Sequence, residues 1–272
     1  MLLGTGTPNA EVERSGPATA IVVDGVAYLV DCGPGVVRRA QAAKERGIDA
    51  LAPERLQHVF LTHLHSDHTV GLPDLVFTPW VLERAHALEV HGPPGTQRMV
   101  ELVEQAWSED VHLRLDGLEP ATPDGWRANA HDVLPGVVFE DERVRVTAIP
   151  VEHGSWEHAY GYRFETRDRV VVVSGDARPS PALIEAARGC DVLVHEVYSA
   201  ERWLTRPEEW QRYHVAFHTS TVELAAIANE VRPGLLVLTH QLLWGASPKE
   251  LVREVREHYA GPVVCGRDLD VY

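Results

Sequence analysis

The chain has few cysteines, no long hydrophobic run and fewer basic than acidic residues. Its three cysteines, Cys32, Cys190 and Cys265, are odd in number and lack metal-ligand spacing, so we expect small core residues in a reducing, cytoplasmic compartment. No window approaches about 18 uncharged apolar residues, which excludes a transmembrane helix and a membrane partner. Because Met1–Gly4 already has the pattern of a strand, a leader could be missing ahead of it.

The shortage of basic residues bears on the choice of partner. Lysine and arginine number 25 against 40 aspartate and glutamate residues, which gives a net charge of −15. Long phosphate-bearing polymers are usually held by stripes of Lys and Arg, and the sequence shows no such stripe. The acidic balance therefore disfavours nucleic acid as a partner, without excluding it, and favours a small substrate.

No repeat, linker or low-complexity run divides the 272 residues, of which 44% are hydrophobic. Strand-like and helix-like segments alternate in two halves, so we expect a single α/β domain over residues 1–272. Periodicity weakens over residues 108–142, which we expect to form a lid or binding loop. Trp107, Trp126 and His131 are candidates to line a pocket there.

One stretch is rich in side chains that bind metals: residues 62–68 read Thr-His-Leu-His-Ser-Asp-His. The stretch follows an apolar run, 58–61, that predicts a short buried strand, and a Gly-Leu-Pro turn at 71–73 follows it. Chance would give this arrangement of His and Asp in under about one in a hundred chains of this composition. Imidazole and carboxylate are ligands of zinc and similar metals. Four such groups in one loop are more than one tetrahedral ion would bind while keeping a coordination position open. We therefore expect two ions.

Further polar residues follow other predicted strands at their C-terminal ends. These residues are His153, Asp176, Glu196 and His240. Strand ends that converge on one edge form a site, so this recurrence predicts that the residues act together. His218 precedes a Ser-x-x-Glu capping box, and the residues alone leave open whether it is catalytic or part of the helix start.

The 62–68 stretch resembles the signature of the metallo-β-lactamase superfamily. The resemblance implies a mixed α/β fold, the four-layer αβ/βα sandwich, with a one- or two-metal site at the edge between its sheets. Residues 194–197, 217–221 and 238–240 resemble the ribonuclease Z group in particular. Asp176 stands where the best-known β-lactamases of this fold have a cysteine.

The resemblance also implies a role for each candidate residue around two divalent ions, which we expect to be zinc, with manganese or iron as alternatives. One ion would be bound by His63, His65 and His153, the other by Asp67, His68 and His240, with Asp176 bridging them. Glu196 and His218 would handle the proton of the leaving group, and Asp67 is a third catalytic candidate. Asp31 would support the metal loop, although a strand-end cap is an equally good interpretation.

The chain departs from the ribonuclease Z group in one respect. Bacterial members carry a long tRNA-gripping arm between the equivalents of His153 and Asp176, where this chain has only a predicted hairpin. We therefore expect an arm-less relative that hydrolyses small anionic esters, a phosphodiester or an aryl sulfate as in arylsulfatases, through a metal-bridging hydroxide. The alternatives are a ribonuclease Z-type RNA 3′-processing endonuclease, a lactonase or β-lactam hydrolase, and a non-catalytic metal-stabilised module. We expect a homodimer, with the aromatic segment 203–213 forming a rim over the site.

Overall fold

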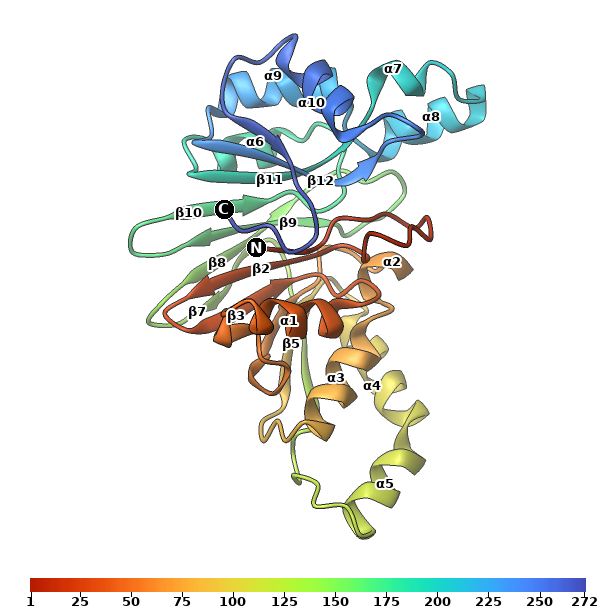
Figure 1. The fold of residues 1–272 in the computed structure, drawn as a ribbon, viewed down its shortest axis with the longest axis vertical. Coiled ribbons are helices and arrows are strands. Elements are labelled where there is room, and N and C mark those ends of the chain that lie inside the picture. The colour runs from red at the N-terminus through yellow and green to blue at the C-terminus, as the bar shows by residue number, and fades with distance from the viewer. The chain divides into compact units, whose positions relative to one another are not determined.

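The computed structural model describes residues 1–272, which form two compact units, each built on one β-sheet (Figure 1). The first unit comprises residues 1–4, 8–134 and 268–271, and the second comprises residues 5–7, 135–267 and 272. No helix in either unit combines the length and the hydrophobicity needed to span a bilayer. The expected single domain over residues 1–272 stays a prediction.

The first unit contains a six-stranded sheet whose strands follow sequence order. The strands are β1 (Leu2–Gly4), β2 (Ala18–Val23), β3 (Val26–Val30), β4 (His58–Phe60), β5 (Leu88–Gly92) and β6 (Ala128–Asp132). The first three strands pair antiparallel, and β3 to β6 pair parallel. Asp24 and Gly25 both have positive φ, as a two-residue hairpin turn between β2 and β3 requires.

Helices follow the parallel strands of the first unit, because a parallel connection needs a crossover. They are α1 (Val36–Glu45), α2 (Ser66–Thr69), α3 (Leu72–Val81), α4 (Thr96–Ala106) and α5 (Ser108–Asp116), with short 3₁₀ turns at Asp49–Leu51 and Pro53–Arg55. Buried residues of the strands, such as Leu29 and Val59, pack with Val36 and Leu75 of the helices in one core cluster.

The second unit contains a seven-stranded sheet in the order β13, β12, β11, β10, β9, β8, β7. Its strands are β7 (Gly136–Glu140), β8 (Arg145–Pro150), β9 (Tyr160–Glu165), β10 (Val170–Val173), β11 (Val192–Tyr198), β12 (Leu235–Leu242) and β13 (Val263–Cys265). Strands β10 to β13 are parallel and the others antiparallel. Its helices are α6 (Pro181–Ala187), α7 (Ala200–Trp203), α8 (Glu208–Phe217), α9 (Thr221–Val231) and α10 (Pro248–Arg256).

Two sequence expectations about the elements are wrong. Residues 108–142 are not an irregular lid, because they contain α5, β6 and β7. Strands β11 and β12 do not end at Glu196 and His240 but continue to Tyr198 and Leu242. The strands continue because Val197 pairs with Gln241 beyond the predicted ends.

Candidate metal and catalytic site

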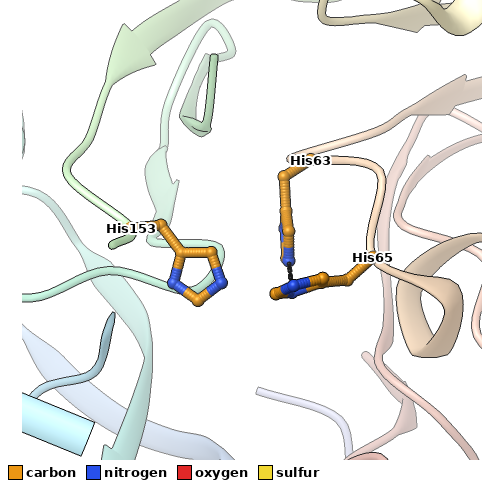
Figure 2. Close-up of side chains that lie close together, drawn as sticks. All are labelled: His63, His65 and His153. Atoms are coloured by element: carbon orange, nitrogen blue, oxygen red, sulfur yellow. Dashed lines mark hydrogen bonds between the residues drawn. The ribbon is translucent and has the colours of Figure 1, made fainter. Parts of the chain in front are cut away.

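The first unit carries four predicted ligands on the loop after β4 and the first turn of α2. His63 and His68 are buried and His65 is half-buried. His63 Nε2 lies 2.9 Å from His65 Nδ1 (Figure 2), and His68 Nε2 lies 3.5 Å from Asp67 Oδ2. Two ligand atoms on one tetrahedral zinc ion lie about 3.3 Å apart, given metal–nitrogen distances of about 2.0 Å. The spacing of both pairs therefore fits metal binding.

Asp31 orients this loop from the end of β3. Its carboxylate accepts hydrogen bonds from the Thr62 amide (2.8 Å), the Thr62 hydroxyl (2.9 Å) and His68 Nδ1 (2.7 Å). Because the Thr62 hydroxyl donates to Asp31, it accepts from His63 Nδ1 at 3.0 Å. Both histidines then carry their proton on Nδ1, and Nε2 becomes the atom able to bind a metal. Asp31 thus supports the metal loop, as the resemblance implied.

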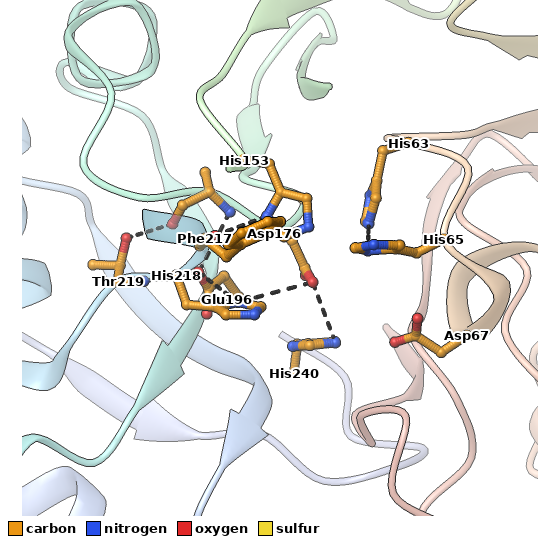
Figure 3. Close-up of polar contacts among 12 residues, drawn as sticks. His63, His65, Asp67, His153, Asp176, Glu196, Phe217, His218, Thr219 and His240 are labelled. Carbon is orange, nitrogen blue, oxygen red and sulfur yellow. Dashed lines mark hydrogen bonds and ion pairs between the residues drawn. The ribbon is translucent and has the colours of Figure 1, made fainter. Parts of the chain in front are cut away.

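The second unit brings five of the predicted residues together (Figure 3). The ligand atoms of His153, Asp176 and His218 all lie within 4.8 Å of one another. His240 Nε2 lies 3.5 Å from Asp176 Oδ2. His218 Nδ1 lies 3.9 Å from Asp176 Oδ2 and 3.4 Å from Glu196 Oε1. All five side chains are buried, so this is a dense polar cluster that is almost closed to solvent.

A β-bulge places His240 in this cluster. Glu196 pairs with Thr239 and Val197 pairs with Gln241, so His240 is an extra residue in β12. Its φ of 41° lies in the left-handed region, which is unusual for a residue other than glycine. Bulges redirect side chains next to active sites, and this one accompanies the approach of His240 to Asp176.

Two groups that the sequence analysis did not assign also hold the cluster. His153 Nδ1 donates to the carbonyl of Phe217 at 2.7 Å, which leaves Nε2 as its metal-binding atom. The Thr219 amide donates to Glu196 Oε1 at 2.9 Å. A carbonyl or amide is present in every residue, so no sequence pattern could have identified these two groups.

Glu196 is almost completely buried on β11, and its Oε2 has no hydrogen-bond partner. Burial, reinforced by the nearby Asp176 carboxylate, raises the pKa of the Glu196 carboxyl well above its usual range. Its Oε1 lies 3.4 Å from His218 Nδ1, so the two side chains are neighbours, and their role as a proton-handling pair stays a prediction.

The three predicted pocket residues each contact a neighbour within the first unit. The Trp107 ring lies 5.5 Å from that of Phe77, and Trp126 Nε1 donates to the Pro123 carbonyl. His131, on β6, bonds to Glu89 through Nε2 at 2.8 Å. Their role as pocket-lining residues stays a prediction.

Comparison with known proteins decides the family. Residues 6–241 match the family model described as the Beta-lactamase superfamily domain. The chain belongs to this superfamily. The ribonuclease Z of Mycobacterium bovis is 34% identical over 274 residues, covering 98% of this chain and 95% of the relative. That of Mycobacterium marinum is 35% identical over 245 residues, covering 88% and 84%. The resemblance to the ribonuclease Z branch is therefore confirmed.

Solved structures of the superfamily share the fold. The metallo-beta-lactamase fold protein YhfI from Bacillus subtilis has a TM-score of 0.75 at 18% identity, covering 98% of this chain and 95% of its own. Human tRNase Z, short form, has a TM-score of 0.74 at 20% identity, covering 100% and 97%. The expected metallo-β-lactamase sandwich fold is confirmed.

These comparisons confirm a metal-dependent hydrolase that uses divalent ions and correct one expectation. The view that nucleic acid is a disfavoured partner is wrong, because the relatives that match nearly the whole chain are ribonucleases. The argument from charge failed because net charge describes the whole chain and says nothing about local clusters of basic residues. The relatives also favour the RNA-processing alternative over the small-ester interpretation.

Proposed function

We propose that this protein is a ribonuclease Z-type endonuclease that cleaves RNA near a 3′ end. The observation that carries the proposal is the 34% identity to ribonuclease Z over 98% of the chain. The aligned region contains every predicted metal ligand, and it also contains Glu196 and His218. The buried, pre-oriented histidines support catalysis rather than a purely structural role.

We also propose that the predicted ligands hold two divalent ions, with zinc favoured by the nitrogen-rich donor set. The proposed ligands are His63, His65, Asp67, His68, His153, Asp176 and His240. When bound, such a pair lowers the pKa of water and offsets negative charge on a phosphate. Asp67 would orient the attacking water, since its carboxylate lies beside His68.

His218 and Glu196 would supply the proton that the departing ribose oxygen needs. A departing alkoxide is a poor leaving group, so a positioned acid contributes most there. His218 Nδ1 faces Glu196 Oε1 at 3.4 Å, which orients the ring. Burial, followed by the nearby Asp176 carboxylate, raises the pKa of the Glu196 carboxyl, which favours its protonated form relative to an exposed glutamate.

The test compares substrates on metal-loaded protein. We expect cleavage of a precursor tRNA with a 3′ extension, loss of cleavage in a chelator, and no cleavage by Asp176→Ala. Asp176 lies between His240 and His218, so its loss should also lower the metal content measured by elemental analysis. Hydrolysis of an aryl sulfate or bis-aryl phosphate without RNA cleavage would overturn the proposal in favour of the small-ester alternative.

A further inference from the structure

A basic hollow lies in the second unit, outside the cluster around Asp176. It is a cavity of about 470 Å³ between α10 and the chain just after β13. Four of the residues that line it are cationic: Lys249, Arg253, Arg256 and Arg267. No acidic residue lines it. In a chain of net charge −15, this "α10 hollow" is a local concentration of positive charge.

Helical periodicity brings the cations together. Lys249, Arg253 and Arg256 are spaced four and three residues apart, so they lie on one face of α10. They are separated in the sequence by glutamates, which explains why the sequence shows no basic stripe. Folding into a helix turns Glu250 and Glu254 away from this face, while Glu257, directly after α10, lies 3.6 Å from Arg253.

The acidic residues of α10 are engaged elsewhere. Glu250 closes the capping box at Ser247 and bonds to Arg202. Glu254 is buried and accepts from the Ser199 hydroxyl at 2.6 Å and the Thr221 hydroxyl at 2.7 Å. Arg253 already forms an ion pair with Glu201 at 2.7 Å, so part of its charge is neutralised within the protein. Lys249 and Arg256 are therefore the residues best placed to bind an external anion.

The hollow adjoins the strand that carries His240. Cys265, in its wall, pairs with Leu238 of β12. Gln241, directly after His240, donates through Nε2 to the Gly266 carbonyl at 2.8 Å. A long substrate bound near His240 therefore has the hollow one strand away within the same unit.

We propose that the α10 hollow binds a backbone phosphate of the RNA substrate, away from the bond that is cut. The inference rests on the proposed function. Phosphate contacts from Arg and Lys position a nucleic acid without reading its sequence. They are also the contacts that an acidic protein most needs, because its overall charge repels the polyanion.

The experiment uses a charge-matched pair of double variants on the full, metal-loaded chain. The test variant is Lys249→Gln with Arg256→Gln. The control is Lys44→Gln with Arg46→Gln, which removes the same charge from the exposed end of α1 in the first unit. Binding of a fluorescent precursor tRNA is measured by anisotropy over a series of salt concentrations.

We expect the test variant to reduce the steepness of the slope of log affinity against log salt concentration by about 1 to 2. Each lost contact between a cation and a phosphate lowers this slope by roughly 0.7–0.9. KM for RNA should rise about tenfold or more while kcat changes little, and the control should match the wild type. Equal slopes in the two variants would overturn the proposal. The proposal would also be overturned if the wild-type hollow binds inorganic phosphate but the test variant binds RNA with the affinity and salt slope of the wild type. Because binding is read without cleavage, a wild type that binds but does not cut RNA would count against the proposed function alone.

Discussion

Asp31 shows how one residue determines which atoms of a metal loop are presented. Its φ of 62° is left-handed, and its carboxylate fixes Thr62 directly and His63 through the Thr62 hydroxyl. The sequence placed an aspartate at a strand end but could not decide between a cap and a support. The decision depends on a partner, Thr62, that lies 31 positions away in the chain.

We expect Asp31→Asn to weaken metal binding about 10- to 100-fold while the protein stays folded. Asparagine tolerates the left-handed backbone and keeps the size of the side chain, so the change removes mainly the charge that fixes His68. Competition with a metal-binding dye measures the affinity. Asp168→Asn, in the exposed turn after β9, is the control and should leave the affinity unchanged.

The position of His218 is compatible with both interpretations that the sequence left open, and its catalytic role stays a prediction. It directly follows α8, precedes the Ser220 cap of α9, and faces Glu196. If it acts as an acid, His218→Ala should lower turnover on RNA about 10²-fold or more and affect a nitrophenyl diester much less. Equal losses on both substrates, with metal content unchanged, would refute the acid role and leave only a structural one.

At the scale of elements, apolar periodicity predicted most helices and strands but not their exact ends. The buried strand expected at residues 58–61 is β4, and the hairpin expected between His153 and Asp176 is β9 and β10. The bulge at His240 could not be predicted, because an extra residue is defined only by the register with β11. The approach of His240 to Asp176 therefore required the structure.

Arg84 is a structural residue that sequence patterns did not identify. It is 1% exposed and donates to the carbonyls of Leu75 and Val76 in the middle of α3 and to that of Gly125. Burial lowers its pKa to about 10, so it remains charged at neutral pH. One guanidinium thus ties α3 to the chain before β6.

We expect Arg84→Met to destabilise the protein by about 2–4 kcal/mol, because several buried carbonyls lose their donor. Urea unfolding measures the difference. Arg98→Met, on the exposed side of α4, is the control and should cost less than about 0.5 kcal/mol, since its ion pair with Glu101 is solvent-exposed. Similar losses in the two variants would show that Arg84 does not carry this role.

At the scale of the whole molecule, composition was informative about class and misleading about substrate. A net charge of −15 is compatible with a basic hollow, because Lys249 and Arg256 occupy one helix face while Glu254 is buried on another. The net charge of a sequence contains no information about where the charged side chains lie on the folded surface. The motifs at residues 62–68 and 217–221 identified the family correctly because they describe a local geometry.

The expected homodimer stays a prediction, and the surface of α7 and α8 is where we place its interface. Exposed apolar side chains gather there: Leu204 is 69%, Trp210 44% and Val215 46% exposed. Exposed aliphatic and aromatic side chains favour burial in an interface. Tyr213, on the same helix, has its ring 6.1 Å from that of His218, so the interface would adjoin the proposed catalytic pair.

Light scattering of the wild type should therefore give about twice the 30.2 kDa chain mass. Leu204→Glu with Val215→Glu should give a monomer, because each carboxylate would have to be desolvated in the interface. Leu118→Glu, on a fully exposed residue of the first unit, should remain a dimer. A wild type that is monomeric and fully active would reject the dimer, and the aromatic residues of α8 would then be available to contact substrate directly.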